Sequence, residues 1–495
     1  MIISPDKRDF STIFNILGKL TLGFSFFMLI PLLVAILKGE TSPFFDFFIG
    51  FLASVSLGIL LLIIFPVKKG VTWIHAFFIV SMSWLMFSLL GAIPLYFSSH
   101  FLSFLDAWFE AMSGLATTGL VLIQDLDHLS AAHNMWRHLM MFIGGQGIIL
   151  ASLSILTNAR SVALGFYIGE ARSEKILPNV VATARFIWKV SFVYLVLGTS
   201  TFFVILYGQG ISWDKSFLHA LWLFFAAFDT GGFSPQSQSI AYYHFFNLEI
   251  ATIVVMILGA INFNLHFWLW TKSKKEIFNN FEIKTFLFTV ILLTMISYFA
   301  FNMIGKSSFM FRKGFYQLIS AHSGCGFTNL SGAEINSFPP LASISVIFAM
   351  MIGGATCSTT GGIKLMRLGI ILKTFFMEIK RRIMPPRAIY KDTFHHLQDL
   401  TLSNQRIKEA YIFFAMFLFT YVAGAIIAMG LGYPPLLALF ESVSATANVG
   451  LSVGITNPAM PLVLKLTYIF QMWAGRLEFI AVFVSVGLVL SLFKK

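Results

Sequence analysis

Residues 108–120 read WFEAMSGLATTGL, and three further stretches of the chain repeat this pattern around one glycine. The copies are LWLFFAAFDTGGF (221–233), FYQLISAHSGCGF (315–327) and LFESVSATANVGL (439–451), and the four glycines are Gly119, Gly232, Gly326 and Gly450. Each glycine is followed by Leu or Phe. Ser or Ala stands six positions before it, and an aromatic residue ten positions before it. Four copies in one register indicate an internal repeat, whereas a lone small-residue pattern in a membrane helix indicates only packing.

The composition around these copies is typical of a polytopic membrane protein. The chain has 495 residues, of which 57% are hydrophobic and 11% charged, and its mean hydropathy is +0.81. Soluble domains carry about 25% charged residues, so the composition excludes a soluble enzyme, a disordered protein and a fibrous protein. Ten long apolar stretches predict membrane spans: 12–37, 47–66, 72–97, 136–157, 186–207, 248–270, 285–304, 341–377, 410–430 and 462–492.

The basic residues predict the orientation of these spans. With the N-terminus inside, the inner segments carry 21 Lys and Arg residues and the outer segments carry 5. Such a bias places both termini in the cytoplasm. It also explains the net charge of +12 without nucleic acid as a partner. We therefore expect a multi-pass protein whose basic loops lie against the lipid headgroups on the inner side.

Each glycine copy lies in an outer segment, and each includes an apolar stretch too short to cross a bilayer. These stretches (101–118, 214–231, 313–325 and 434–449) predict re-entrant helices. The repeating unit is therefore a span, a short helix, a glycine loop and a second span. We expect an all-α fold with four such units around a central pore. The predicted boundaries are 1–70 for a leading two-span hairpin, then 71–170, 171–280, 281–395 and 396–495 for the units.

This arrangement favours a cation at the centre. Four short helices that end near one axis point their partially negative C-terminal ends toward it. A loop after each helix exposes backbone carbonyls, and rings of carbonyls can replace the hydration shell of an alkali ion. Glycine suits such a loop because it reaches backbone conformations that other residues avoid. Asp229 occurs in one copy only, so the carboxylate ring expected of a divalent-cation pore is missing.

The copies and several flanking strings resemble the Trk/Ktr/HKT superfamily of potassium transporters, and most of all its TrkH/TrkG branch. The resemblance covers nearly the whole chain. It rests on TTGL, TGGF, GCGF and NVGL in the four loops, and on the flanking strings WRHLMMFIGGQGI (136–148), NFNLHF (262–267), GGATCSTTGGIKLMR (353–367) and GRLE (475–478). The leading hairpin favours the Trk type over the Ktr type.

The resemblance implies a potassium filter lined by backbone carbonyls. The residues that it assigns to this filter are Thr117, Thr118, Gly119, Thr230, Gly231, Gly232, Gly324, Cys325, Gly326, Asn448, Val449 and Gly450. Relatives that resemble sodium transporters have Ser at the first filter glycine, and Gly at all four positions leans toward potassium. A sodium-permeable pore of the same architecture remains the alternative. Gly231 and Cys325 depart most from the expected pattern.

The eighth predicted span is too long to cross straight and contains a glycine-rich middle. Gly353, Gly354, Gly361 and Gly362 interrupt it, and each costs a helix about 1 kcal/mol relative to Ala. Irregular backbone at membrane depth survives where it lines a cavity or is covered by protein. The resemblance makes this segment an intramembrane loop that gates the pore, with Lys364 directly after it. A plain helix kink is the other interpretation.

Two of the arginines within predicted spans, Arg476 and Arg137, stand out, because a charge inside a span is costly and usually functional. Arg476 is interpreted as a positive charge that faces the pore below the filter and acts with the gate. The alternative is a structural pair with Glu478 or Glu441. Arg137 is expected to anchor a short helix through Glu110 or Asp106.

The remaining expectations concern partners, cofactors and location. The resemblance implies a homodimer in the bacterial cytoplasmic membrane that docks on a cytosolic ring of nucleotide-binding regulatory subunits. The chain has no dinucleotide fingerprint of its own. K⁺ is expected as the transported ion, with no organic cofactor.

Two other classes of protein fit the sequence less well. A secondary transporter with broken helices would carry its binding residues in repeats of many full spans. An integral membrane enzyme would need clustered His, Asp, Glu or Cys at one membrane face, and no such cluster stands out.

Overall fold

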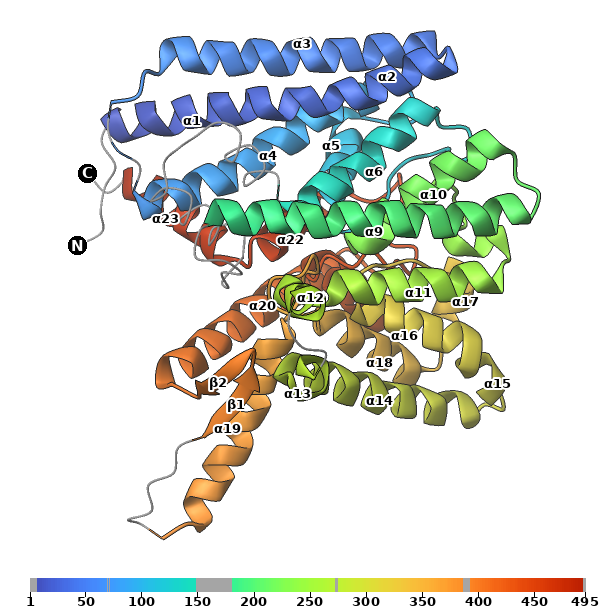
Figure 1. Ribbon diagram of the computed structural model, residues 1–495, viewed down its shortest axis with the longest axis vertical. Helices are drawn as coiled ribbons and strands as arrows, with labels where there is room; N and C mark the ends of the chain where they lie inside the picture. Colours follow the sequence, from blue (N-terminus) through green and yellow to red (C-terminus); the bar gives the residue numbers. More distant parts are fainter. Residues whose placement is uncertain are drawn as a thin grey trace.

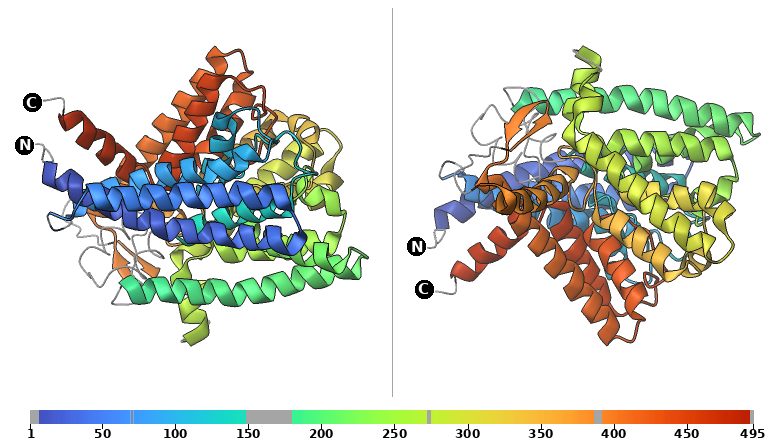
Figure 2. Two further views of the ribbon diagram at one scale, coloured as in Figure 1. Left: turned by 90° about the horizontal axis from the view of Figure 1, so that it is seen from above. Right: turned by 90° about the horizontal axis from the view of Figure 1, so that it is seen from below.

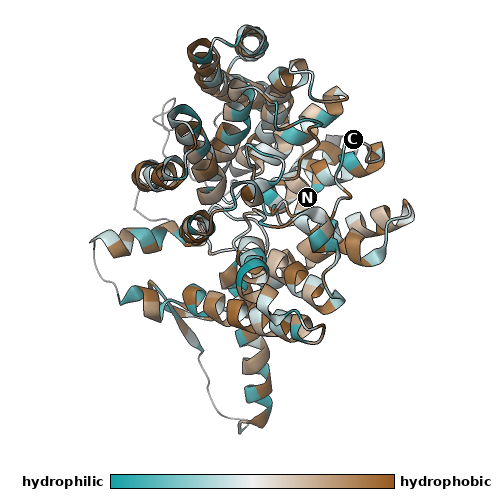
Figure 3. Ribbon diagram, turned by 90° about the vertical axis from the view of Figure 1, so that its right-hand side faces the viewer, coloured by the Kyte–Doolittle hydropathy of each residue, from teal (hydrophilic) through white to brown (hydrophobic). Residues whose placement is uncertain are grey.

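The chain folds as a polytopic all-α membrane protein, as the sequence predicts (Figure 1). The computed structural model describes residues 7–68, 70, 72–147, 180–271, 275–385 and 392–492. Six described helices are long and apolar enough to cross a membrane. They are Arg8–Lys38, Thr41–Ile64, His75–Phe97, Ala182–Gly208, Phe281–Asn302 and Asn404–Gly430. Large apolar side chains on them, such as Leu37, Ile63 and Phe419, are more than 70% exposed, as expected for a lipid-facing surface (Figure 3).

A two-helix hairpin precedes the repeated units. Its first arm is α1 (Lys7–Ser25), the 3-10 turn η1 (Phe26–Met28) and α2 (Leu29–Lys38), and its second arm is α3 (Thr41–Ile64). Gly39, at φ +69°, ends the first arm in the left-handed conformation. The arms cross closely, because a Cβ atom on Gly18 would lie 2.9 Å from the Gly58 carbonyl oxygen.

Four units follow, each with a long helix, a short helix and a second helix. Unit 1 contains α4 (Trp73–Phe97), α5 (Phe104–Leu115) and α6 (Ala131–Gln146). Unit 2 contains α9 (Val180–Gly208), α10 (Trp213–Phe228) and α11 (Phe246–Ala260). Unit 3 contains α14 (Phe281–Asn302), α16 (Phe315–His322) and α18 (Pro340–Met351). Unit 4 contains α20 (Asn404–Gly430), α21 (Pro435–Thr446) and α22 (Leu462–Arg476).

The short helices α5, α10, α16 and α21 are the predicted re-entrant helices, and local sequence sets their ends. Ser103 caps α5 by accepting the Asp106 N–H, and Pro435 opens α21 at a position where its missing N–H costs nothing. Each helix ends just before a residue with positive φ. These residues are Thr117, Thr230, Gly324 and Asn448. The chain therefore turns out of each helix into its glycine loop.

Two predicted single spans are broken, which corrects the expectation for 248–270 and 462–492. The pair α11 and α12 (Phe263–Thr271) bends by 100°, and the pair α22 and α23 (Ile480–Leu492) bends by 113°. Asn262 ends the first piece by accepting the Asn264 N–H on its side chain. Glu478 and Phe479 end α22 with positive φ values of 50° and 64°.

The predicted break in 341–377 is present, between α18 and α19 (Leu365–Ile383). The fourth predicted span, 136–157, is α6 up to residue 147, and its remainder lies outside the described residues. The tail Lys494-Lys495 lies outside them as well.

A hairpin of two short strands was not predicted. Strands β1 (Thr393–His396) and β2 (Gln398–Thr401) pair antiparallel beside α19, and α19 extends away from the helix bundle (Figure 1). The start of α1 and the end of α23 lie on one side of the molecule (Figure 2). Short connecting turns complete the described structure: η2 (Ser239–Tyr243), α13 (Glu276–Asn279), α15 (Ser307–Phe309), η3 (Met310–Gly314) and α17 (Gly332–Asn336).

Candidate functional site

The four glycines form a closed ring in which each lies against the backbone of the next unit. Their φ values are all positive: +94° for Gly119, +71° for Gly232, +83° for Gly326 and +90° for Gly450. A Cβ atom on each would meet a carbonyl oxygen of the next loop, at 2.3 Å (Gly119 to Gly231), 2.1 Å (Gly232 to Cys325), 1.9 Å (Gly326 to Val449) and 2.1 Å (Gly450 to Thr118). No side chain fits at these positions, so both conformation and space require glycine.

The residue before each glycine is bonded to the preceding short helix in the same way in every unit. Its N–H donates to the carbonyl oxygen five residues earlier, at 2.8 Å (Thr118 to Ser113), 2.8 Å (Gly231 to Ala226), 3.0 Å (Cys325 to Ser320) and 2.9 Å (Val449 to Ser444). This shared bond fixes where each loop begins. Gly231 and Cys325, the least expected members of the pattern, therefore occupy the same backbone positions as Thr118 and Val449.

The Ser or Ala six positions before each glycine makes a hydrogen bond with the loop that follows it. The hydroxyls of Ser113 and Ser444 accept the N–H groups of Gly119 and Gly450, each at 3.0 Å. Ser320 instead donates to the Phe327 carbonyl oxygen at 2.6 Å. Unit 2 has Ala226 here, whose backbone oxygen accepts from Gly232 at 3.3 Å. The four units therefore share a backbone hydrogen-bond pattern, whereas their side-chain hydrogen bonds differ.

The polar side chains of the loops point away into bonds with their surroundings. Asn448 donates to Thr118 Oγ1 at 2.9 Å and to the Met472 carbonyl at 3.0 Å. Thr230 Oγ1 lies 3.2 Å from Thr359 Oγ1. Cys325 Sγ donates to the Ala226 carbonyl at 3.4 Å. These side chains therefore bind neighbouring parts of the protein, and the carbonyls before each glycine form the contacts between the loops.

Residues 352–364 form a loop that leaves and returns to the helix at one point. Gly353 donates to the Ile363 carbonyl at 2.9 Å, and Ile363 donates to the Met351 carbonyl at 2.8 Å. Each of the four predicted glycines has a reason to be there. A Cβ atom added to Gly353 would lie 1.8 Å from the Gly361 carbonyl oxygen. One added to Gly354 would lie 2.6 Å from the Ala260 carbonyl oxygen, and one added to Gly361 would lie 2.3 Å from that of Ala447. Gly362 has a positive φ of +67°.

Residues 352–364 lie next to the glycine loops and to the break after α11. Gly361 touches Ala447, three residues before Gly450. Thr359 donates to the carbonyls of Phe228 and Gly259, each at 3.0 Å. Ala355 donates to the Ala260 carbonyl at 2.9 Å. Residues 352–364 therefore occupy the space directly beside the entrances of the glycine loops, and the segment is more than a helix kink.

Lys364 and Arg476 both bind this loop. Lys364 Nζ donates to the Thr360 carbonyl and lies 3.3 Å from Thr360 Oγ1. Arg476, half-buried, donates to the Thr359 carbonyl at 2.6 Å and to Thr117 Oγ1 at 3.1 Å. It also donates to the Gly144 carbonyl at 2.6 Å. Arg476 thus connects residues 352–364, the glycine loop of unit 1 and the end of α6.

The two carboxylates suggested as structural partners of Arg476 have other contacts. Glu478 pairs with Arg367. Glu441 accepts the N–H groups of Val453 and Thr456, each at 2.9 Å. For Arg137, the structure selects Glu110, at 2.7 Å, because Lys465 binds the other candidate, Asp106, at 2.5 Å.

Sequence reasoning missed several contributors. The carbonyls of Gly144 and Gly145 bind Arg476, at 2.6 and 3.4 Å, and the only signal for them was the string FIGGQG. Glu282, at the start of α14, accepts the Thr356 N–H at 2.7 Å and holds the loop from the other side. Nothing in its local sequence marks it. Among the described residues, no group of three or more His, Cys, Asp or Glu side chains could hold a metal ion.

Comparison with known proteins agrees with this architecture along nearly the whole chain. The family described as TrkH, cation transport protein, matches residues 44–490. An uncharacterized cation transporter of Methanocaldococcus jannaschii is 32% identical over 480 residues, which cover 97% of this chain and 95% of that protein. The Trk system potassium uptake protein TrkH of Escherichia coli K12 is 27% identical, covering 95% of this chain and 96% of that protein.

A solved structure shows the same fold. The potassium transporter TrkH from Vibrio parahaemolyticus matches with a TM-score of 0.81 at 25% identity, covering 96% of this chain and 98% of that one. The family match spans more than half of the residues and includes all four glycine loops and the intramembrane loop. The chain belongs to the TrkH family of cation transport proteins.

Proposed function

We propose that this chain is the ion-translocating subunit of a potassium uptake system. The observation that carries the proposal is the closed ring of four glycine loops, in which one backbone carbonyl from each unit lies beside the glycine of the unit before it. Relatives along the whole chain are named as potassium uptake proteins. No covalent chemistry and no catalytic residue is part of the proposal.

In this proposal K⁺ passes through the ring on backbone carbonyls. The residues that supply them are those predicted from the sequence: Thr117 to Gly119, Thr230 to Gly232, Gly324 to Gly326, and Asn448 to Gly450. Carbonyl oxygens replace the water around the ion, and several adjacent sites let it leave again. The C-terminal ends of the four short helices add partial negative charge on the same axis.

The intramembrane loop and Arg476 act as the gate. Gly353, Gly354, Gly361 and Gly362 allow the loop to pack against the filter loops, and Lys364 and Arg476 hold it there. Because Arg476 binds both Thr117 and the Thr359 carbonyl, its charge lies at the inner end of the filter. Opening requires residues 352–364 to move away from the filter loops. It also requires Arg476 to turn away from the ion path.

The setting follows from the family and from the basic residues. We place the protein in the bacterial cytoplasmic membrane with both termini inside, as the distribution of Lys and Arg favours. The domain boundaries 1–70, 71–170, 171–280, 281–395 and 396–495 divide it into the hairpin and four pore units. We further propose a homodimer that binds a cytosolic nucleotide-binding regulatory ring.

Ion flux into liposomes that contain the purified chain tests the proposal. Potassium and sodium gradients are compared in parallel, with empty liposomes as the control. Selective potassium flux is expected. Equal or sodium-favouring flux would keep the pore and replace potassium by the alternative, a sodium-permeable pore. Proton- or sodium-coupled uptake without passive flux would instead favour a secondary transporter. Absence of any flux, with and without a cytosolic regulatory subunit, would contradict the pore itself.

A further inference from the structure

We call the three residues that follow each repeat glycine the exit strand of that unit. In two units, the side chain nine positions before the glycine accepts a hydrogen bond from the last residue of this exit strand. In unit 1, Glu110 accepts the N–H of Leu122, three residues after Gly119, at 2.9 Å. In unit 4, Glu441 accepts the N–H of Val453, three residues after Gly450, also at 2.9 Å. Both carboxylates are fully buried. The same two positions of the repeat are thus joined by the same bond.

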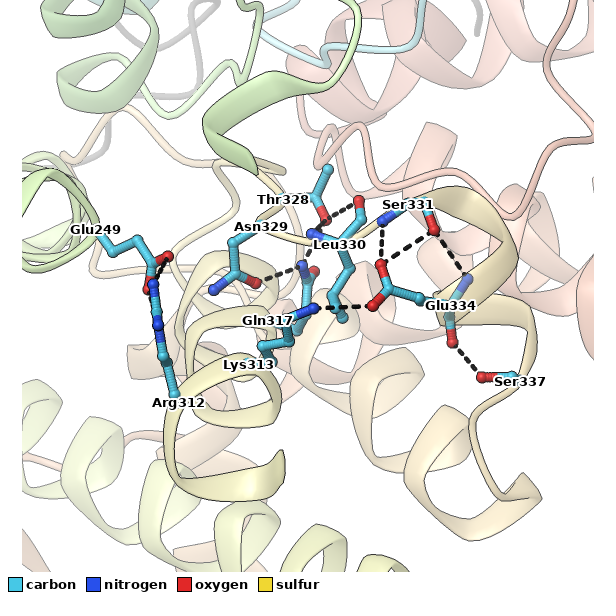
Figure 4. A network of polar contacts seen from close by, with 10 residues as sticks. All are labelled: Glu249, Arg312, Lys313, Gln317, Thr328, Asn329, Leu330, Ser331, Glu334 and Ser337. Atoms are coloured by element: carbon cyan, nitrogen blue, oxygen red, sulfur yellow. Dashed lines mark hydrogen bonds and ion pairs between the residues drawn. The ribbon is translucent and has the colours of Figure 1, made fainter. Parts of the chain in front are cut away.

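Unit 3 has a weaker version of this contact. Gln317 stands nine positions before Gly326, and its amide nitrogen donates to Thr328 Oγ1 at 2.6 Å (Figure 4). Its second contact, to Asn329 Oδ1, is 3.5 Å long. An amide nitrogen cannot accept an N–H as a carboxylate does. The exit strand is therefore held through side chains here.

Unit 2 has no such contact of its own, and the reason is visible in the sequence. The residue nine positions before Gly232 is Leu223, and the residue three positions after it is Pro235. Proline has no N–H to donate, so a carboxylate at position 223 would have no equivalent partner. An apolar leucine at position 223 is therefore consistent with a proline at position 235.

Arg137 of unit 1 reaches this exit strand instead. Its Nε and Nη2 lie 2.8 and 2.7 Å from Glu110 Oε1, and its Nη1 donates to the Ser234 carbonyl, two residues after Gly232, at 3.3 Å. The guanidinium also lies over the Phe233 ring, with its carbon 4.2 Å from the ring centre. Arg137 is fully buried, so its charge is compensated by Glu110. Glu110 and Arg137 together therefore contact the exit strands of two neighbouring units, unit 1 and unit 2.

We propose that Glu110 and Arg137 form a shared clamp that positions the filter exits of units 1 and 2, and that Glu441 serves unit 4 alone. The proposal rests on the filter assigned under the proposed function. These residues do not face the ion. They act through the backbone, because the position of each exit strand fixes the glycine and the carbonyls just before it. Selectivity then depends on four exits that are held by different means.

Arg137→Lys tests the clamp in the full-length protein. Lysine keeps the charge beside Glu110, but it lacks the planar fork that reaches both Glu110 and Ser234. The permeability ratio of K⁺ over Na⁺, from reversal potentials with K⁺ on one side of a planar bilayer and Na⁺ on the other, is expected to fall about tenfold, which corresponds to about 1.4 kcal/mol. Thermal stability and monodispersity are measured on the same sample.

Arg312→Lys is the matched control. Arg312 also pairs with a buried glutamate, Glu249, through two bonds of 2.9 and 3.1 Å (Figure 4). Its guanidinium carbon lies 5.3 Å from the centre of the Phe246 ring. This pair does not touch the strand after any filter glycine. Its replacement by lysine is expected to leave the permeability ratio unchanged.

Glu441→Gln supplies a second, independent test should Arg137→Lys not fold. Within the described part of the chain no cation pairs with Glu441, so the variant leaves no uncompensated charge. Its amide nitrogen would meet N–H donors at Val453 or Thr456, and the ratio is again expected to fall. An unchanged ratio in folded Arg137→Lys overturns the clamp of units 1 and 2, and an unchanged ratio in folded Glu441→Gln overturns its premise, that a buried carboxylate at this position of the repeat positions the filter. A wild-type protein without potassium selectivity would contradict the proposed function instead, so the two failures are distinguishable.

Discussion

The glycine ring and residues 352–364 are both irregular backbone at membrane depth, yet they are held in different ways. In the ring, each glycine lies against a carbonyl of the next unit, and no side chain could take its place. The 352–364 loop also packs its glycines against backbone carbonyls and makes backbone hydrogen bonds to Met351 and Ala260. In addition, Lys364 and Arg476 donate to its carbonyls, and Glu282 accepts the Thr356 N–H. The ring therefore depends on backbone contacts between units, whereas the loop is also held by side-chain bonds that substitutions can remove one at a time. In the function proposed above, the ring discriminates between ions and the 352–364 loop opens, and this difference in support is what the following variants test.

Gly232→Ser is expected to have the largest effect and tests the ring. A left-handed backbone at a residue other than glycine costs about 1–3 kcal/mol, and the new Cβ atom would stand 2.1 Å from the Cys325 carbonyl oxygen. We expect the K⁺ over Na⁺ permeability ratio to fall by roughly tenfold or more, measured from reversal potentials.

Gly305→Ser is the control for that variant. Gly305 has the same φ of +71°, and a Cβ atom there would have nothing within 4 Å. The strain is therefore matched and the crowding is absent. If both serine variants lowered the ratio equally, or neither did, the ring would not be the source of selectivity.

Deletion of residues 355–361 tests the other side of the comparison. Without this segment the packing of Gly361 on Ala447 and the bond from Arg476 to the Thr359 carbonyl are lost, and basal flux is expected to rise by about tenfold if about 1.4 kcal/mol of closure is lost. Flux into liposomes without any partner is the measurement. Thr359→Val is the milder variant, since it removes the bonds to Phe228 and Gly259 at similar volume. Unaltered flux in both would exclude a gate at this position.

Arg476→Ala addresses the contact between the two regions and is expected to raise flux several-fold. A hydrogen bond to a charged group contributes about 1.5–3 kcal/mol, and Arg476 donates to carbonyls of the loop and of α6. Arg476→Lys separates charge from geometry: low flux would assign the barrier to the charge, and high flux would assign it to the forked bonds. Aggregation of the alanine variant would favour a purely structural arginine.

The smallest effect is expected at the hairpin formed by β1 and β2. Hydrogen bonds that the imidazole donates to the carboxylates of Glu276 and Asp399 raise the pKa of His395 above its ordinary value. A raised pKa in the folded state stabilises the protein below about pH 6.5, and this contribution is lost as the pH rises through the folded value. Since the imidazole is about a third exposed, we expect at most about 1 kcal/mol. Thermal unfolding at pH 6 and pH 8 should show the change in the wild type and not in His395→Gln.

The sequence predicted the parts of this structure that depend on local chemistry. The four filter glycines were visible because positive φ and close backbone approach admit no other residue. The break at 352–364 was visible because glycines cluster there. The breaks after α11 and α22 were missed, since each lies inside a long apolar stretch that has only a single glycine nearby, Gly259 or Gly475. Asn262 accepts the Asn264 N–H at the first bend, and Glu478 and Phe479 have positive φ at the second.

Long-range partners could not be predicted for a physical reason. Asp106 and Glu110 lie one helical turn apart, so both could face Arg137. Lys465, which settles the choice by binding Asp106, is 359 residues away in sequence. Glu282 is a further example, because its partner Thr356 is 74 residues away in sequence. The chemistry of the filter was thus local, and the support behind it was not.

The most direct test is to locate Rb⁺, a potassium substitute that scatters X-rays anomalously, in crystals of the full-length protein. The account predicts anomalous density on the axis of the ring, among the carbonyl oxygens of Thr118, Gly231, Cys325 and Val449. This density should disappear when Rb⁺ is replaced by Na⁺. Absence of density there at saturating Rb⁺, or density of Rb⁺ only at side-chain carboxylates elsewhere, would contradict the carbonyl filter.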